Sequence, residues 1–297
     1  MPVLVLFTLS LTALMIGLGF GVMLNRGAFE RRVDAEVATL FGELETLPTY
    51  HAERELEGLP APVQRFMRRN LDDGAPHLSC VRLRKTGTVR ERPGQPWTEY
   101  EAEEYVVAST PALLWYARLR PFPLVWVDSR ELLLQGRGHA LAKLFSTLPS
   151  VDRDDDATRR ALMLRWMASL VYVPSALLAR EGLSWTALDD DRAELRLSEG
   201  ELEVHGIFVF DDKGDVIRFE SEERPWTGDS RPSTALWIVE YGEHRGFGSL
   251  SIPTRVAQRW ELDGQTFPYQ ESKLELFETE VPRRFGTPSP RARAEQA

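Results

Sequence analysis

The side chains best suited to metal binding or acid–base chemistry are dispersed along this chain. Its five histidines are His51, His77, His139, His205 and His244. No two of them stand at the spacing used by helical or zinc-finger metal sites. Ordinary surface or core histidines are therefore favoured, and a metal site assembled from residues distant in the chain is the less favoured alternative. We expect no metal and no cofactor.

Two acidic runs, Asp152–Asp156 and Asp189–Asp191, offer the oxygen ligands that divalent cations prefer. Each run also has a simpler explanation. The first precedes a helical stretch, where carboxylates suit the positive end of the helix dipole. The second fits a solvated turn between two strands. We favour the simpler explanation for both runs.

The glycine-rich segments and the single cysteine do not identify a reaction. Gly136–Gly138 is not followed by the rest of a dinucleotide-binding fingerprint, and Gly246–Ser249 lacks the spacing of a nucleophile elbow. Cys80 lies in a strand-like segment, where a small core residue is the favoured role. We assign no catalytic residue.

Aromatic residues are the remaining candidates for a functional site. The eight tryptophans mostly occupy strand or helix positions that can face inward. A large core explains them most simply, whereas a cavity for an acyl chain or another apolar ligand is the functional alternative. The helix broken at Pro174 would expose backbone at the mouth of such a cavity. Arg118 and Arg120, which precede a Pro-Phe-Pro break, would either meet a lipid head group or be ordinary exposed strand residues. The candidate ligand-binding residues are Trp115, Arg118, Arg120, Trp166, Tyr172, Pro174, Trp237, Tyr241 and Trp260.

An uninterrupted apolar run from Val3 to Leu24 contains no charged side chain. A helix of that length spans a bilayer core of about 30 Å at about 1.5 Å per residue. A secretory signal peptide is the alternative, but no basic residue precedes the run, the run is too long, and no good cleavage site follows it. We predict an uncleaved single-pass anchor in the cell membrane, with the lipid bilayer as a partner.

Residues in and after this run carry two further signals. Lys and Arg are absent before it and three arginines follow within 26–32, which by the positive-inside rule places the main domain in the cytoplasm. Ala13, Gly17 and Gly21 fall four residues apart on one helix face, a spacing that lets two membrane helices approach closely. The frequency of glycine in membrane helices explains this spacing more simply, so it favours at most a weak homodimer.

The composition is that of an acidic globular protein. Of its 297 residues, 43% are hydrophobic and 27% are charged, which excludes a disordered chain. A net charge of -9 repels phosphate backbones, so we expect no nucleic-acid partner. The length beyond the apolar run suffices for one large domain or two small ones.

The hydrophobic period changes along the chain. Helical spacing predicts an amphipathic helix over 29–47 and a short helix over 62–71. From Leu78 the period is two, with strands over 97–107, 113–119 and 125–134 and a break at Pro121 and Pro123. An interior helix is predicted over Thr158–Arg180, split by Pro174 near Tyr172. The later strands, joined by short turns, predict an antiparallel meander.

Several pieces of the chain resemble, in order, an uncharacterised bacterial family, the domain of unknown function 6544. They are Leu59–Phe66, Tyr172–Leu178, Phe208–Asp211 with Gly214, Ile252–Thr254 and Phe267–Tyr269. The resemblance covers Leu59 to Glu280. It implies no activity, so it assigns no catalytic residue.

A looser similarity concerns architecture alone. Long antiparallel strands, a Phe-Asp-x-x-Gly turn, an interior helix and a closing Ile-Pro strand resemble the lipoprotein-carrier fold of bacterial envelopes. In that fold a curved sheet wraps helices around an apolar cavity. Those carriers work outside the inner membrane, so this similarity favours a periplasmic or extracytoplasmic domain, against the charge rule. A reporter fused after Ala297 would distinguish the two orientations.

These signals together predict an α+β protein. It comprises a transmembrane anchor (1–25), an amphipathic helical stalk (26–58), a mostly antiparallel, curved, half-barrel-like sheet packed on one or two helices (59–281), and a disordered basic tail (282–297). The leading function is non-enzymatic binding of a lipid or another apolar ligand at the membrane. An enzyme acting on membrane-derived substrates and an envelope scaffold that binds protein are the alternatives.

Overall fold

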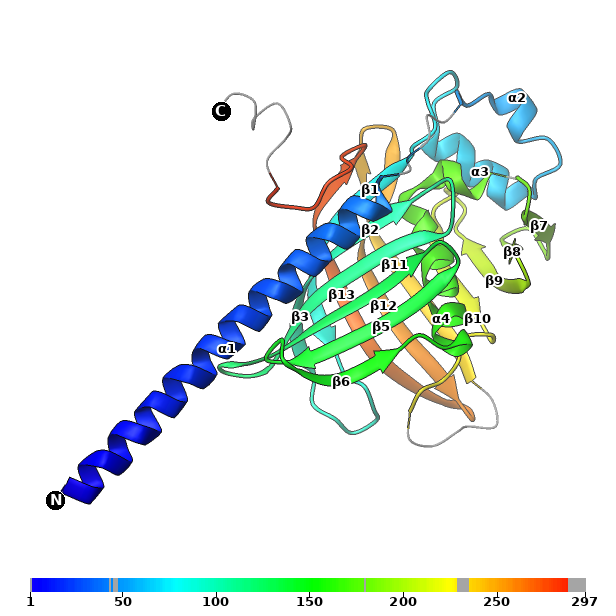
Figure 1. The fold of residues 1–297 in the computed structure, drawn as a ribbon. Coiled ribbons are helices and arrows are strands. Elements are labelled where there is room, and N and C mark those ends of the chain that lie inside the picture. The colour runs from blue at the N-terminus through cyan, green and yellow to red at the C-terminus, as the bar shows by residue number, and fades with distance from the viewer. Residues whose placement is uncertain (1, 43, 45–47, 179, 229–234, 288–297) are drawn as a thin grey trace, which may run out of the picture.

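The computed structural model describes residues 2–42, 44, 48–178, 180–228 and 235–287, with side chains from Val5 onward. In that part of the chain, 13 strands form one curved antiparallel sheet (Figure 1), which confirms the predicted α+β class. The strands are β1 (Cys80–Val89), β2 (Thr98–Val107), β3 (Ala112–Phe122), β4 (Val125–Leu134), β5 (Arg137–Leu144), β6 (Leu148–Arg153), β7 (Leu183–Ala187), β8 (Arg192–Glu199), β9 (Leu202–Phe210), β10 (Val216–Ser221), β11 (Ala235–Phe247), β12 (Leu250–Leu262) and β13 (Gln265–Thr279).

The sheet consists of two meanders that meet in its middle. Strands β1 to β6 pair in sequence order on one side, and β13 back to β7 on the other. The two meanders join where β1 pairs with β13, with Leu83 opposite Phe277. Strands β6 and β7 are therefore the two edges. Because side chains alternate along each strand, the sheet has an inner face that carries Leu83 and an outer face that carries Tyr105.

Helix α4 (Asp156–Ser169) and two 3-10 turns, η1 (Leu170–Tyr172) and η2 (Pro174–Leu177), connect the two edges across the inner face (Figure 1). The Asp155 side chain accepts a hydrogen bond from the backbone N–H of Thr158 at 2.8 Å, which caps the helix. The α-helix ends before Pro174, which cannot continue it, so the predicted split is confirmed.

Helix α4 is packed closely on the sheet along its buried side. Leu162, Trp166 and Leu170 are buried in the main hydrophobic core. At the N-terminal turn, α4 touches the backbone of β5 at Gly138. A Cβ at this position would lie 2.5 Å from the Cα of Arg159, so only glycine permits the approach.

Helix α1 (Pro2–Leu40) continues without a break from the apolar run onto the outer face (Figure 1). Its side chains from Val5 to Phe20 are exposed, and it is long and apolar enough to cross a membrane. From Phe29 onward, the side chains at the predicted helical spacing pack against β2, β3 and β5 in a second core cluster. The segment predicted as a stalk therefore begins with a helix that covers the sheet.

Two short helices cover one end of the sheet, α2 (Ala52–Glu55) and α3 (Ala61–Asn70). Pro62 lies in the first turn of α3, where it leaves no hydrogen bond unmade. The apolar stripe of α3 is buried in the main core, including Val63 and Phe66. The short helix predicted over 62–71 is thus present.

The strands differ from the predicted pattern in two places. Strand β3 continues through Pro121 to Phe122 because the register between β3 and β4 shifts there, so no ladder hydrogen bond is required of the proline. Strands β5 and β6 occupy residues 137–144 and 148–153, where no strand was predicted.

The tail that the sequence predicts to be disordered begins at Pro282 and lies only partly within the described residues. Residues 288–297 lie outside the described residues. Arg284 and Phe285, however, are buried against α1 and β2. The Phe285 ring packs in the second core cluster, and Arg284 pairs with carboxylates of α1. Neither tertiary contact has a local sequence signal.

Candidate functional site

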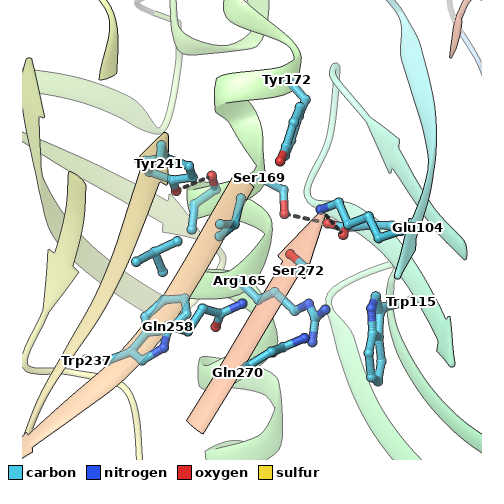
Figure 2. A pocket seen from close by; sticks show the side chains of 14 residues that line it. Glu104, Trp115, Arg165, Ser169, Tyr172, Trp237, Tyr241, Gln258, Gln270 and Ser272 are labelled. Carbon is cyan, nitrogen blue, oxygen red and sulfur yellow. Dashed lines mark hydrogen bonds and ion pairs between the residues drawn. The ribbon is translucent and has the colours of Figure 1, made fainter. Parts of the chain in front are cut away.

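A small cavity of about 30 Å³, called the inner cavity here, lies between α4 and the inner face (Figure 2). It combines aromatic, charged and amide side chains from the two meanders and the helix. Its lining consists of Lys85, Glu104, Trp115, Arg165, Ala168, Ser169, Tyr172, Trp237, Val239, Tyr241, Val256, Gln258, Gln270 and Ser272. Such a polar lining is unusual on a face that is otherwise apolar.

The charged side chains of the inner cavity are paired. Lys85 Nζ lies 2.8 Å from Glu104 Oε2, and the Ser169 hydroxyl donates to Glu104 Oε1 at 2.7 Å. Arg165 pairs with Glu131 and lies with its guanidinium carbon 4.5 Å from the Trp115 ring centroid. Glu104 is only 2% exposed. Burial alone would raise the pKa of Glu104, but Lys85 and Arg165 outweigh it and lower that pKa to about 2.

Acidification is expected to remove the stabilising contribution of Glu104. Because its folded-state pKa is lowered from 4.5 to about 2, the contribution is complete above pH 4.5 and is lost as the pH falls towards 2. The Glu104→Gln variant cannot titrate at this position. Urea unfolding at about pH 6 and about pH 3 should therefore show a smaller pH dependence in this variant than in the original chain. Equal pH dependence in both proteins would contradict the charged state assigned to Glu104.

Two tyrosine hydroxyls also lie around the inner cavity. The Tyr241 hydroxyl donates to the backbone carbonyl of Ala168 at 2.7 Å. The Tyr172 hydroxyl is buried without a hydrogen-bond partner among the described residues and points towards Ser169 and Glu104 (Figure 2). Burial, and then the charge of Glu104, raise the pKa of Tyr172, so its hydroxyl remains a donor. An unpartnered buried donor is a group that a ligand oxygen would satisfy.

Four of the nine candidate ligand-binding residues line the inner cavity: Trp115, Tyr172, Trp237 and Tyr241. Three others lie in the core behind it. Trp166 is fully buried and donates from Nε1 to the backbone carbonyl of Val107, Pro174 is buried in η2, and Trp260 packs edge-on against Trp226. Their assignment to ligand binding stays a prediction.

The two candidate arginines lie away from this cavity. Arg118 and Arg120 are an odd number of residues from Trp115 on the same strand, so they face outward while Trp115 faces inward. Arg118 pairs with Glu30 of α1 and with Asp128, both at 2.8 Å. Arg120 is exposed and pairs with Glu101 at 3.0 Å. The strand geometry therefore does not bring these arginines to the inner cavity, and their assignment to ligand binding stays a prediction.

Several polar residues of the inner cavity were not identified from the sequence. Lys85 and Glu104 occupy inward positions of otherwise apolar strand faces, between Leu83 and Gly87 and between Ala102 and Val106. The available sequence signal was a charged residue at a position where the two-residue periodicity predicts an inward-facing apolar side chain. Arg165, Gln258 and Gln270 carry no comparable local signal.

A second depression, the outer groove, has a volume of about 460 Å³ and is open to solvent. It lies over β1, β11, β12 and β13, where Gly242 adds no side-chain bulk. The exposed side chains around it are mostly polar, and they include Arg255, Glu271 and Lys273. It is open to solvent and its lining contains no tryptophan, which distinguishes it from the inner cavity.

The residues considered for metal or thiol chemistry have structural roles. Asp155 caps α4, and Asp189 accepts hydrogen bonds from the backbone N–H groups of Asp191 and Arg192 in a turn. Cys80 is fully buried in the second core cluster, and burial raises the pKa of its thiol to about 11. The favoured explanations for the acidic runs and the cysteine are thus supported by direct contacts.

The matches among solved structures include two proteins of low sequence identity to this chain. A LolA superfamily protein from Nitrosomonas europaea aligns with 75% of this chain and 95% of its own, at 10% identity and a TM-score of 0.43. A DUF1329 family protein from Desulfovibrio piger aligns with 79% of this chain and 99% of its own, at 10% identity and a TM-score of 0.35.

Sequence comparison places the chain in one family. No curated protein sequence matches it. The model of a family of unknown function, DUF6544, matches residues 49–272. That range contains all strands from β1 to β12 and every residue of the inner cavity. The chain therefore belongs to the DUF6544 family of unknown function.

Proposed function

We propose that this protein is a membrane-tethered, non-enzymatic binding protein that takes up an amphipathic ligand, such as a lipid, between α4 and the inner face. The observation that carries the proposal is the inner cavity itself. It places charged and hydroxyl groups next to Trp115 and Trp237 at the centre of an apolar sheet face. A ligand with a polar end and an apolar body matches both kinds of lining.

The tether is α1. Its charge-free run is long enough to cross a bilayer. The helix continues unbroken through residues 20–30, the region where a signal peptide would have to be cut. Just beyond that region, Phe29 and Val33 are buried on the outer face, so the helix is part of the folded body as well. These features support an uncleaved anchor.

Ligand uptake requires movement of the interior helix. A volume of about 30 Å³ is that of one or two water molecules and is far below the size of an acyl chain. Helix α4 packs mainly on β3, β4, β5 and β9 and continues into η1, which packs on β12. Ala168, Ser169 and Tyr172 of this segment line the cavity together with residues of β11, β12 and β13. We infer that this segment separates from those strands when a ligand enters, and that the Tyr172 hydroxyl then donates to the polar end of the ligand.

Photo-crosslinking is expected to place a lipid at the inner cavity. The full chain in phosphatidylcholine nanodiscs would be illuminated with a diazirine-bearing fatty acid and digested for mass spectrometry. We expect adducts on peptides that contain Tyr172, Trp237 or Tyr241, in addition to those on α1. Adducts confined to α1 would contradict an interior site, because a membrane helix reacts with any lipid probe.

A matched pair of variants makes this test specific. Ser272→Leu fills the inner cavity from β13, whereas Thr86→Leu adds the same side chain on the outer face of the adjacent strand β1. The interior adducts should fall several-fold in Ser272→Leu and persist in Thr86→Leu. Equal yields in the two variants would show that the probe does not occupy the cavity.

The homodimer through Ala13, Gly17 and Gly21 stays a separate proposal. In the described chain, a Cβ at Gly17 or Gly21 would have no neighbour within 4 Å. Gly17 is exposed to a second helix, whereas the fold partly covers Gly21. Small residues at this spacing support close helix packing in membranes.

A further inference from the structure

The exposed apolar side chains of the sheet domain are concentrated at one end. Outside α1, the three most exposed large apolar residues of the described chain are Leu124 at 92%, Phe122 at 68% and Leu148 at 59%. Phe122 and Leu124 form the turn between β3 and β4, and Leu148 begins β6 after the turn from β5. We call these three residues the tip patch.

The tip patch lies beside the place where the apolar run of α1 ends. The Asn25 side chain donates to the Thr147 hydroxyl at 3.2 Å, next to Leu148. The Arg26 guanidinium carbon lies 5.9 Å from the centre of the Trp126 ring, two residues after Leu124. The turn between β3 and β4 is seen against α1 in Figure 1. Asn25 and Arg26 directly follow the charge-free run.

The β3–β4 turn also extends past this boundary along the apolar run. Arg118 contacts Glu30, and Phe122 is four residues further along β3, which is about 13 Å at about 3.3 Å per residue. The same distance corresponds to about nine residues of α1, which leads to its Gly21–Val22 segment. Within Val5–Leu24, Gly21 and Val22 are the residues that the fold half covers. The tip patch therefore lies level with the last turn of the apolar run.

Backbone geometry at the turn adds a second observation. Leu124 adopts a φ of 66°, in the left-handed region that favours glycine or asparagine. A leucine here is conformationally costly, and its side chain is almost wholly exposed instead of contributing to the core. Strain of this kind is retained where surrounding contacts or function require it.

We propose that the tip patch inserts into the interfacial region of the lipid bilayer alongside α1. This inference rests on the anchor proposed above, because it takes the level of the membrane from the apolar run. Trp126 and Arg26 then lie at the depth of the lipid head groups, where tryptophan and arginine are favoured. A second contact at a fixed distance from α1 would hold the sheet in one orientation against the membrane.

Site-specific fluorescence in nanodiscs tests the insertion. The variants Leu124→Cys and Leu148→Cys of the full chain would be labelled with the polarity-sensitive dye NBD in discs of phosphatidylcholine and phosphatidylglycerol. Cys80 is buried with a raised pKa, so it does not compete for the label. We expect blue-shifted emission at both positions and quenching by lipids that carry a spin label near the head group.

Two further labelled variants separate this proposal from the anchor on which it rests. Leu14→Cys reports the centre of the apolar run, and Leu188→Cys reports an exposed apolar residue after β7. If Leu14 is quenched by lipid and Leu124 is no more quenched than Leu188, insertion of the tip patch is overturned and the anchor stands. If Leu14 is not quenched, the anchor fails, and the inference fails with it. Protection of Leu124 that depends on protein concentration would assign the patch to a second copy and overturn membrane insertion.

Discussion

Replacing Arg284 with alanine is expected to loosen α1 from the sheet and to lower the free energy of unfolding by about 3 kcal/mol. The guanidinium of Arg284 is 2.6 Å from Glu30, 2.8 Å from Asp34 and 3.0 Å from Glu103. Burial alone would lower the pKa of Arg284, but Glu103, Glu30 and Asp34 raise it above its ordinary value. Removal of this cation takes the arginine partner from Asp34 and Glu103 and leaves Glu30 paired with Arg118 alone.

The measurement has a local and a global part. Chemical denaturation of the full chain in detergent gives the change in stability, and hydrogen exchange of residues 29–40 reports the loosening of α1. Arg283→Ala is the matched control, since the backbone carbonyl of Arg283 still accepts its hydrogen bond from Arg82. We expect a change within about 0.5 kcal/mol for the control. Faster exchange in both variants, or in neither, would contradict the role given to Arg284.

Lysine at this position should recover only part of the loss. It retains the positive charge of Arg284 but cannot direct a planar fork of donors at three carboxylates. The order of stability is therefore expected to be the original chain, then Arg284→Lys, then Arg284→Ala. This order separates the contribution of charge from that of hydrogen-bond geometry.

The Glu104→Ala variant is expected to lose about 3–5 kcal/mol of stability. Glu104 is buried, and its removal leaves Lys85, itself only 7% exposed, without its carboxylate partner. Glu101→Ala is the control on the same strand, because Glu101 faces outward and pairs at the surface with Arg120. Exposed pairs contribute about 1 kcal/mol or less. Thermal or urea unfolding of the two variants gives the comparison.

A double variant distinguishes an uncompensated charge from simple loss of packing. Replacement of a buried ion pair by apolar side chains of similar size is often close to neutral. Lys85→Met with Glu104→Leu should therefore be more stable than Glu104→Ala alone. If the proposed function is correct, this double variant recovers stability while its photo-crosslinks at the inner cavity weaken. A double variant less stable than Glu104→Ala would mean that the pair itself stabilises the fold.

Local signals were sufficient for much of the fold. Two-residue periodicity located most strands, Pro174 located the end of α4, and the spacing from Phe29 onward identified the face of α1 that is buried on the sheet. Strands β5 and β6 were missed because they contain Gly138 and Pro149, which are unfavourable in strands.

The inner cavity was less accessible to sequence analysis because it is assembled from distant residues. Trp115, Tyr172, Trp237 and Tyr241 were identified by type, and the fold brings them together. Lys85 and Glu104 meet because β1 and β2 pair in a register that sets Lys85 opposite Ala102, two residues from Glu104. No local sequence pattern specifies that register. The face of Arg118, by contrast, follows directly from its odd separation from Trp115.

The two edges of the sheet have a consequence for self-association. A long open sheet has unpaired backbone N–H and C=O groups at each edge, and these can add strands from another molecule and lead to fibrous aggregates. Here both edge strands are short, β6 at 6 residues and β7 at 5. Strand β6 also contains Pro149, which has no N–H to donate, and ends in charged residues. Molecules concentrated on a surface collide often. Short edge strands of this composition disfavour the addition of a strand from a neighbouring molecule.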